Sequence, residues 1–288
     1  MYQPVDLGPG SLLWRWAGDG RIGFLGGTIG LLQLLHPAIG AGVTEHSDFF
    51  NDPFDRIARS LPNILGVIYD GPDAEATGRK VRDFHRDIKG IDAAGRRYHA
   101  LDPATYWWAH ATFQFMAEQV AERFDAHRLT TAERDQLYLE GVEWYRRYGV
   151  SDRAVPPDYA AFRVEWDRVC TEVLEMNAAA EWVLESLHAA RALPGPSLPA
   201  IGQAMLRFWP ARRFGMHGAR LVSVGGLPSS VRKRFGIPWS RQDAIELALL
   251  ERTVRRTWPL MPASVRWHPR ARAGHRRVRE QSRARMAA

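Results

Sequence analysis

The fold is decided by residues 52–90, which read DPFDRIARSLPNILGVIYDGPDAEATGRKVRDFHRDIKG. Asp52 followed by Pro53 is a typical helix start, because the acid caps the first turn and proline lacks an N–H that would stay unpaired there. Apolar residues then recur every three or four positions, which predicts a helix over 54–69. A second helix is expected over 73–89, ended by Gly90. The segment therefore predicts two consecutive amphipathic helices.

The helical period continues through most of the chain and almost nowhere gives way to the two-residue alternation of strands. Asp102 and Pro103 repeat the same start signal, and Thr130 with Glu133 has the spacing of a capping box. Further helices are expected over 131–148, 158–175, 177–191, 199–213 and 241–257. With 288 residues, 45% of them hydrophobic, the chain can bury a large core. We predict an all-α protein and exclude a disordered one.

A long uncharged stretch covers residues 22–43. Its length meets the test for a membrane span, which needs roughly 20 residues. Four glycines recur in it at helical spacing, however, and Pro37 interrupts the run. We therefore expect a buried helix of a soluble protein, with peripheral membrane contact as the second interpretation.

The positive charge is concentrated at the C-terminus. The net charge is +7, and residues 264–288 hold eight Arg against Glu280 alone, which accounts for +7. Residues 1–263 are therefore neutral overall, which argues against a nucleic-acid-binding body. We predict one helical domain over 1–263 and an Arg-rich tail over 264–288, expected to be solvated and partly disordered. Only the tail has the charge to contact phosphates or anionic lipid head groups.

Cysteine usage and the N-terminus indicate a compartment. Cys170 is the single cysteine, so no disulfide framework or cysteine-ligated metal site is expected. Residues 1–10 lack the basic start and apolar run of a secretory signal. We expect a cytoplasmic protein, with peripheral membrane association through the basic tail as an addition.

Histidines are the residues best suited to chemistry in this chain. The sequence contains no GxGxxG after a strand, phosphate loop, HExxH, GxSxG or CxxC. His85 lies on the apolar side of the predicted helix 73–89. A neutral imidazole in apolar surroundings suits the axial ligation of haem iron. The second interpretation of His85 is a core histidine whose hydrogen bonds are satisfied within the protein.

A polar face on the helix before His85 adds to this pattern. Arg56, Arg59 and Ser60 fall on one side of the predicted helix 54–69. Such groups can bind haem propionates or a bound oxygen molecule. The two helices together therefore carry the kinds of residue that a haem site needs, although a histidine on an apolar helix face is more often a core residue with satisfied hydrogen bonds.

Four blocks in order resemble one known family. They read LLQLLHPAIGAGVTEHSDFF, DPFDRIARS, VRDFHRDIKG and GRRYHALDPATYWWAHATF. The set resembles the catalytic domain shared by the bacterial latex clearing proteins, which are rubber oxygenases, and the MpaB-type oxygenases. The likeness runs from about Trp14 to residues 262–272. It implies a globin-like helical core with additional helices, and a single haem-oxygenase-like domain over 1–263.

The resemblance implies a role for each candidate residue. In rubber oxygenases a helix with an Arg, then a Lys and a Thr three and four positions on, lies over the distal side of haem b. Arg56, Arg59 and Ser60 match that spacing and are implied to be the catalytic residues, with Arg56 also contacting the cofactor. The family's proximal ligand is a histidine in a setting similar to VRDFHRDIKG, so His85 is implied to bind the iron.

Two more histidines are candidates for contact with the cofactor. His46 lies in the stretch TEHSDFF, where a solvated or structural role is the alternative. His110 lies among tryptophans, where a core hydrogen bond is the favoured interpretation. A second ligand or a propionate contact is the other interpretation of His110.

The sequence also departs from the rubber enzyme. Arg59 stands where that enzyme has a lysine, and a guanidinium has no free lone pair for iron. The glutamate proposed there as a base has no clear counterpart, because its position is read as Gly40 and the nearest acid is Glu45. Cleavage of polyisoprene is therefore not expected.

The resemblance implies an oxygenase that activates dioxygen at haem iron and oxidises an apolar, isoprenoid or lipid-like substrate. An electron donor, if one is needed, is not indicated by the sequence. A helical protein that carries haem or lipid without turnover is the alternative, and the missing glutamate favours it. A third interpretation is an interaction module whose Arg-rich tail docks on membrane or nucleic acid.

Overall fold

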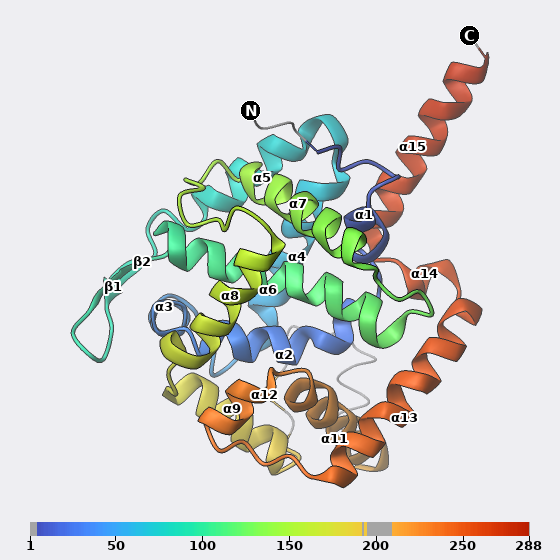
Figure 1. Ribbon diagram of the computed structural model, residues 1–288. Coiled ribbons are helices and arrows are strands. Elements are labelled where there is room, and N and C mark those ends of the chain that lie inside the picture. The colour runs from blue at the N-terminus through green and yellow to red at the C-terminus, as the bar shows by residue number, and fades with distance from the viewer. Residues whose placement is uncertain (1–4, 192, 195–208, 288) are drawn as a thin grey trace.

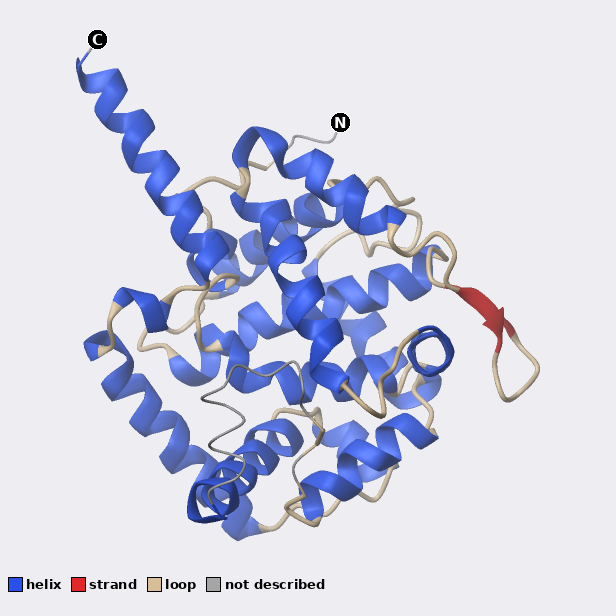
Figure 2. Ribbon diagram, turned by 180° about the vertical axis from the view of Figure 1, so that it is seen from behind, coloured by secondary structure: helices blue, strands red, loops and turns tan. Residues whose placement is uncertain are grey.

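The computed structural model describes residues 5–191, 193–194 and 209–287. Within these residues the chain is helical apart from one small antiparallel sheet, as Figure 1 and Figure 2 show from opposite sides. The prediction of an all-α protein is confirmed. The globin-like arrangement of the central helices stays a prediction.

The described helices cover most of the described residues. In chain order they are α1 (Leu12–Trp16), α2 (Ile22–Leu34), α3 (Pro37–His46), α4 (Pro53–Tyr69), α5 (Ala74–Asp83), α6 (Pro103–Gln119), α7 (Thr131–Arg146), α8 (Tyr159–Arg168), α9 (Ala178–His188), α11 (Trp209–Gly225), α12 (Ser229–Arg234), α13 (Arg241–Thr257), α14 (Ala263–Arg266) and α15 (Pro269–Ala287). Single turns of 3-10 or π geometry are η1 (Gly71–Asp73), η2 (Val120–Phe124), η3 (Val169–Val173) and η4 (Trp258–Leu260). The strands β1 (Lys89–Ile91) and β2 (Arg97–His99) form a hairpin that projects from the body (Figure 1).

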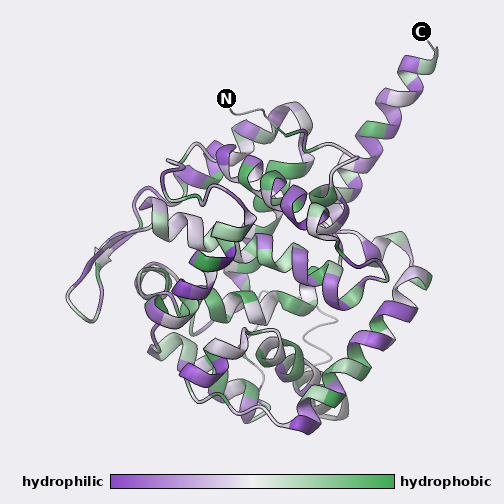
Figure 3. Ribbon diagram, viewed as in Figure 1, coloured by the Kyte–Doolittle hydropathy of each residue, from purple (hydrophilic) through white to green (hydrophobic). Residues whose placement is uncertain are grey.

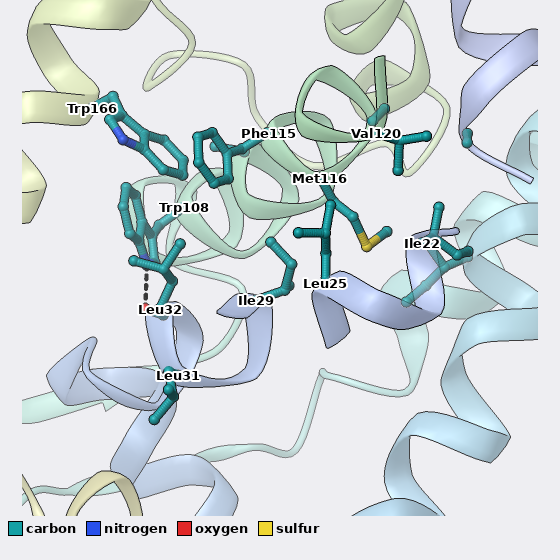
Figure 4. Close-up of a cluster of buried hydrophobic side chains, with 14 of the residues drawn as sticks. Ile22, Leu25, Ile29, Leu31, Leu32, Trp108, Phe115, Met116, Val120 and Trp166 are labelled. Carbon is teal, nitrogen blue, oxygen red and sulfur yellow. Dashed lines mark hydrogen bonds between the residues drawn. The ribbon is translucent and has the colours of Figure 1, made fainter. Parts of the chain in front are cut away.

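The core is built around α2. This helix packs against α6 on one side and α11 on another, so its apolar residues are buried around most of its circumference. Figure 4 shows Leu25 and Ile29 of α2 facing the aromatic side of α6, where Trp108 and Phe115 meet Trp166 of α8. The Trp108 indole N–H donates to the Leu32 carbonyl at 3.1 Å, so its polar atom is satisfied inside the core.

The predicted helix starts are confirmed where their caps can be seen. The Asp52 carboxylate accepts a hydrogen bond from the Asp55 N–H at 3.1 Å, and Asp102 accepts one from the Ala104 N–H at 3.0 Å. Both hydrogen bonds of the capping box between Thr130 and Glu133 are present. Local side-chain chemistry therefore sets these three boundaries.

Some predicted helices differ in extent. The helix expected over 22–43 is two helices, α2 and α3, which bend by 101° because His36 before Pro37 takes an extended conformation. The helix expected over 158–175 ends as α8 and continues as the π turn η3. Of the helix expected over 199–213, residues 199–208 lie outside the described residues and α11 begins at Trp209.

The described helices differ in length or hydropathy from membrane-spanning helices. None of them alone is long and apolar enough to cross a bilayer. Only the bent pair α2 and α3, taken together, meets the length and composition limits.

A buried cluster of three charged residues, Arg21 with Asp19 and Asp125, ties separate helices together. The Arg21 guanidinium, with its side chain 7% exposed, binds Asp19 and Asp125 at 2.8 Å each and donates to the Phe124 carbonyl at 2.6 Å. These bonds join the start of α2 to the end of η2. Because the charges are paired and hydrogen-bonded, their burial is tolerated.

Tyr69 joins three parts of the chain. It is fully buried at the end of α4, and its hydroxyl donates to the Trp14 carbonyl at 2.7 Å and accepts from the Gly18 N–H at 2.9 Å. The carbonyl of Tyr69 accepts from Arg277 of α15. The N-terminal helix, α4 and the C-terminal helix therefore meet at one side chain.

The expectation of a disordered tail is wrong for the first part of residues 264–288. Trp267 forms a backbone bridge with Asp19, Arg270 binds Asp70 at 2.6 Å, and Ala271 is fully buried. The count of charged residues did not predict this packing. The small residues of α15 that contact α4 are few, and they lie among many arginines in the sequence. The outer part of α15 projects from the body and is largely hydrophilic (Figure 3).

A matched pair of glycines tests the packing. A Cβ on Gly78 of α5 would overlap the Arg147 carbonyl, whereas a Cβ on Gly26 of α2 would meet no described atom within 4 Å. We expect Gly78→Ala to lower the free energy of unfolding by about 1–3 kcal/mol through overpacking. Gly26→Ala should raise it by about 0.5–1 kcal/mol, because alanine favours the helix. Urea unfolding of both variants measures this, and a shift of both in one direction would contradict it.

Candidate functional site

The candidate site lies on a helical hairpin formed by α4, η1 and α5. The two helices pack together, and Gly66 of α4 lies against Thr77 of α5. The Thr77 hydroxyl donates to the Asp70 carboxylate at 2.7 Å, which fixes the closed end of the hairpin. Arg59 lies seven residues before Gly66 and His85 eight residues after Thr77. Both therefore lie on the same side of this contact, along the two arms.

The predicted distal residues occupy the exposed half of α4. Arg59 has a side chain 72% exposed and pairs with Asp55 at 2.5 Å, one helical turn earlier. Ser60 is half-buried, and Ile57 beside them is 49% exposed, which is unusual for a large apolar residue. Arg56 belongs to the same helix, but its side chain lies outside the described residues. This half of α4 thus presents charge, a hydroxyl and apolar surface together.

His85 lies after the end of α5. The helix expected to reach residue 89 ends at Asp83, so this prediction was wrong. The Val81 carbonyl, which would accept the His85 backbone N–H in a continuing helix, faces the His85 imidazole instead, with Nδ1 at 2.8 Å. The backbone N–H of His85 turns to the Arg82 carbonyl at 2.9 Å. The His85 imidazole therefore takes the place of the His85 backbone N–H at the Val81 carbonyl, and the helix ends here.

That hydrogen bond also determines the tautomer of His85. A carbonyl oxygen only accepts, so Nδ1 carries the proton, and in the neutral ring the lone pair is on Nε2. Metal-binding histidines in proteins usually donate their other ring N–H to a carbonyl or carboxylate in this way. The ring is half-buried and meets Tyr106 edge-on, with 5.6 Å between the ring centroids. The donor chemistry of His85 therefore fits an iron ligand.

His46 is exposed and is the last residue of α3, so the stretch TEHSDFF begins in a helix. Its ring approaches Tyr98 of β2 edge-on at 6.5 Å. The Tyr98 hydroxyl donates to the Glu45 carboxylate, and burial followed by this bond raises the pKa of Tyr98 to about 12. His46 and Glu45 thus face the strand hairpin that follows His85. The cofactor contact of His46 stays a prediction.

Gly40 explains one departure from the rubber enzyme. A Cβ at this buried position would lie 2.5 Å from the Leu34 carbonyl oxygen and 2.8 Å from the Asn177 amide nitrogen. Both are closer than a real Cβ approaches other atoms, so the local packing requires glycine. A glutamate does not fit here in this structure, and Glu45 remains the nearest acid along α3.

His110 is part of the core. It is 2% exposed, and its Nε2 lies 2.8 Å from the Gly141 carbonyl, so this nitrogen carries the proton. Its Nδ1 is buried without a hydrogen-bond partner among the described residues. Burial lowers the pKa of His110 to about 3. The core hydrogen bond is present, and a contact with the cofactor would have to use Nδ1.

Two tyrosines that the sequence analysis did not single out for the site connect His85 to His110. The ring of Tyr106 meets the His85 ring with 5.6 Å between centroids, and it meets the Tyr148 ring with 5.5 Å between centroids. The Tyr148 ring in turn lies 5.8 Å from the His110 ring, centroid to centroid. His85 and His110 are therefore neighbours through two rings but not in direct contact. The i, i+4 spacing of Tyr106 and His110 was the available signal, since it puts both on one face of α6.

A small cavity lies between α6 and α8. Its volume is about 90 Å³, and its lining includes His36, Trp108 and Trp166. Ligand pockets usually measure about 300–1,000 Å³, so this space does not accommodate a porphyrin. None of Arg59, Ser60 and His85 lines it. The case for a haem therefore rests on the α4 and α5 hairpin and not on this cavity.

The fold is all-helical, and the candidate site consists of the exposed half of α4, with Arg59 and Ser60, and of His85 after the end of α5. The family described as ER-bound oxygenase mpaB/B'/Rubber oxygenase, catalytic domain, matches residues 14–256, and the chain belongs to this family. No curated protein and no solved structure matches the chain. The chain is thus a member of an oxygenase family, whose reactions combine a substrate with O2.

The buried His110 ring predicts a pH dependence of stability. The unfolded ring binds a proton near pH 6.5, whereas the folded ring does so only near 3. Falling pH therefore favours unfolding, by about 1.4 kcal/mol per pH unit between these values. His110→Gln should flatten the slope of unfolding free energy against pH by about that amount. The control His46→Gln removes an exposed imidazole, and equal slopes in both variants would refute the prediction.

Proposed function

We propose that the chain is a haem b-dependent oxygenase that uses O2 to oxidise a small apolar substrate of the isoprenoid or lipid-like kind. The observation that carries the proposal is the hydrogen bond between His85 Nδ1 and the Val81 carbonyl at 2.8 Å. In the neutral imidazole this bond places the lone pair on Nε2, and iron ligation uses a neutral imidazole nitrogen. Membership of an oxygenase family supports the same reaction class.

Each residue of the hairpin has a defined part in this proposal. His85 would hold the iron through Nε2, and the Val81 carbonyl would fix the ring's orientation. Haem, when bound, supplies the activation of O2, while the protein supplies binding and orientation. Ser60 offers a hydroxyl that both donates and accepts hydrogen bonds. Arg59, and Arg56 by its place on α4, offer permanent positive charge and N–H donors for propionates or oxygen atoms.

Arg59 also limits what the site can do. A guanidinium keeps its proton and has no lone pair to donate, so Arg59 cannot serve as an iron ligand as a lysine can. The exposed apolar surface of Ile57, next to Arg59 and Ser60, suits a substrate without charge. The cytoplasmic location stays a prediction.

One observation favours a second function. The position read as the counterpart of the family's glutamate is Gly40, which packing prevents from being larger, and the Glu45 carboxylate is occupied by the Tyr98 hydroxyl. If the reaction needs a carboxylate base, this chain lacks it at that place. The alternative is therefore a helical protein that binds haem or lipid without turnover.

Haem loading tests the ligand assignment. Wild-type protein expressed with added haem is expected to show a Soret band, and His85→Ala should lose it, because the axial ligand is gone. The matched control is His99→Ala, which removes a half-buried imidazole of β2 that binds the Arg86 carbonyl. A colourless wild type, or a His85→Ala protein that keeps the band unchanged, would count against the proposal.

Turnover tests the residues on α4. Ser60→Ala is expected to slow O2 consumption with the best of a panel of isoprenoids by about tenfold or more, as loss of one preorganised donor does. Haem content should stay near that of the wild type, and Arg56→Gln should behave alike. Ser282→Ala, on the exposed part of α15, is the control. A haem-loaded wild type that consumes no O2 with any substrate would support the non-catalytic alternative.

A further inference from the structure

A second cavity lies at the C-terminal segment, away from the α4 and α5 hairpin arms. Its volume is about 420 Å³, and four arginines dominate its lining. The lining side chains include Arg266, Trp267, Arg272, His275, Arg276 and Arg279. The cavity falls within the range of about 300–1,000 Å³ that ligand pockets usually occupy. All of these residues lie outside residues 14–256, so the family's catalytic domain does not account for the cavity.

The positive charge of this cavity is not balanced within the described part of the chain. None of Arg266, Arg272, Arg276 and Arg279 forms an ion pair with a described acid. Their neighbour Arg270, which does not line the cavity, is paired with Asp70. Guanidinium groups stay protonated at any physiological pH, so four positive charges converge on one concave surface.

Buried donors point to a ligand with several acceptor atoms. Nε of Arg266, Nε of Arg272 and Nε2 of His275 are buried with no hydrogen-bond partner among the described residues. The Trp14 indole N–H donates to His275 Nδ1 at 3.1 Å, so the proton of this imidazole must sit on Nε2. Buried N–H groups normally have a partner, and the three residues that carry these unpaired donors all line the cavity, which favours an acceptor there.

The walls of the cavity are held in place before any ligand binds. The Gly20 N–H donates to the Arg266 carbonyl at 2.8 Å, and the His268 N–H donates to the Gly18 carbonyl at 2.9 Å. His275 contacts Trp267 edge-on at 4.9 Å, and Ala271 is fully buried on the inner side of α15. Such preorganisation reduces the entropy lost on binding.

We propose that this cavity binds a phosphorylated organic anion, with a terminal phosphate or diphosphate group bound by the arginines and His275 Nε2. Phosphate fits better than a single carboxylate, because it offers more charge and more acceptor oxygens to a set of guanidinium forks. The Trp267 ring provides an apolar wall for the organic part of the ligand. The proposal does not depend on haem binding or on the oxygenase reaction.

Two sources share this chemistry: a soluble organic phosphate, and a phospholipid whose head group ends in a phosphate monoester. Two apolar residues close in sequence to the lining residues bear on the second source, because Leu260 is 79% exposed and Val265 is 49% exposed. Apolar side chains next to a cationic site suit the boundary of an anionic bilayer. The experiment therefore needs one arm for each source.

The first arm is calorimetric titration of the full-length protein with inorganic pyrophosphate. The variant Arg272→Gln with Arg276→Gln should bind about 100-fold more weakly, because each charge-assisted hydrogen bond contributes about tenfold. The matched control, Arg283→Gln with Arg285→Gln, removes the same charge from exposed positions of the same helix. It should bind as the wild type does. Arg276 is exposed, so Arg276→Gln alone serves if the double variant does not fold.

The second arm is sedimentation with phosphatidylcholine vesicles that contain phosphatidic acid, compared with vesicles that contain phosphatidylglycerol. Preference for phosphatidic acid, lost in the cavity variant and kept in the control, would assign the site to a lipid head group. Pyrophosphate binding without vesicle binding would assign it to a soluble phosphate. Binding of neither probe, or equal loss in the cavity and control variants, would overturn the proposal, since diffuse charge would then explain any attraction.

Discussion

The hydroxyl of Tyr69 is the contact on which the arrangement of the candidate site depends. It bonds the Trp14 carbonyl and the Gly18 N–H at the point where α4 ends, in a place that water does not reach. Burial raises the pKa of this phenol far above its ordinary value, so it stays protonated and keeps its donor. The closed end of the hairpin is thereby anchored, while the half of α4 with Arg59 and Ser60 extends to the surface.

What could be predicted from the sequence was local. The caps at Asp52, Asp102 and Thr130 are satisfied by residues two or three positions away, so the sequence alone contains the information. The end of α5 is different, because the His85 imidazole competes with its own backbone N–H for the Val81 carbonyl, and apolar periodicity does not register that competition. The packing of residues 264–278 also escaped prediction, since its partners, such as Asp19 and Asp70, are about 200 positions or more away in the chain.

The places of the candidate residues in the fold were predicted with unequal success for the same reason. Arg59, Ser60 and His85 do belong to one hairpin, as two consecutive amphipathic segments indicate. The positions of Tyr106 and Tyr148 between His85 and His110 depend on three-dimensional contacts between α6 and the segment that follows α7. Gly40 is the clearest case of a departure with a physical cause: a family position without its acid is one where the backbone of Leu34 leaves no room for any side chain.

The packing of α15 on α4 also means that the family match and the cooperative folding unit have different ends. The match stops at residue 256, yet Ala271 and Gly274 cover Tyr69, and Arg277 binds its carbonyl. A protein shortened to residues 14–256 would expose the aromatic contact between Trp14 and Tyr69 to solvent. Loss of α15 would remove the contacts of Gly274 and Arg277 with Tyr69 at the closed end of the hairpin. The C-terminal segment therefore stabilises the catalytic domain from outside the matched residues.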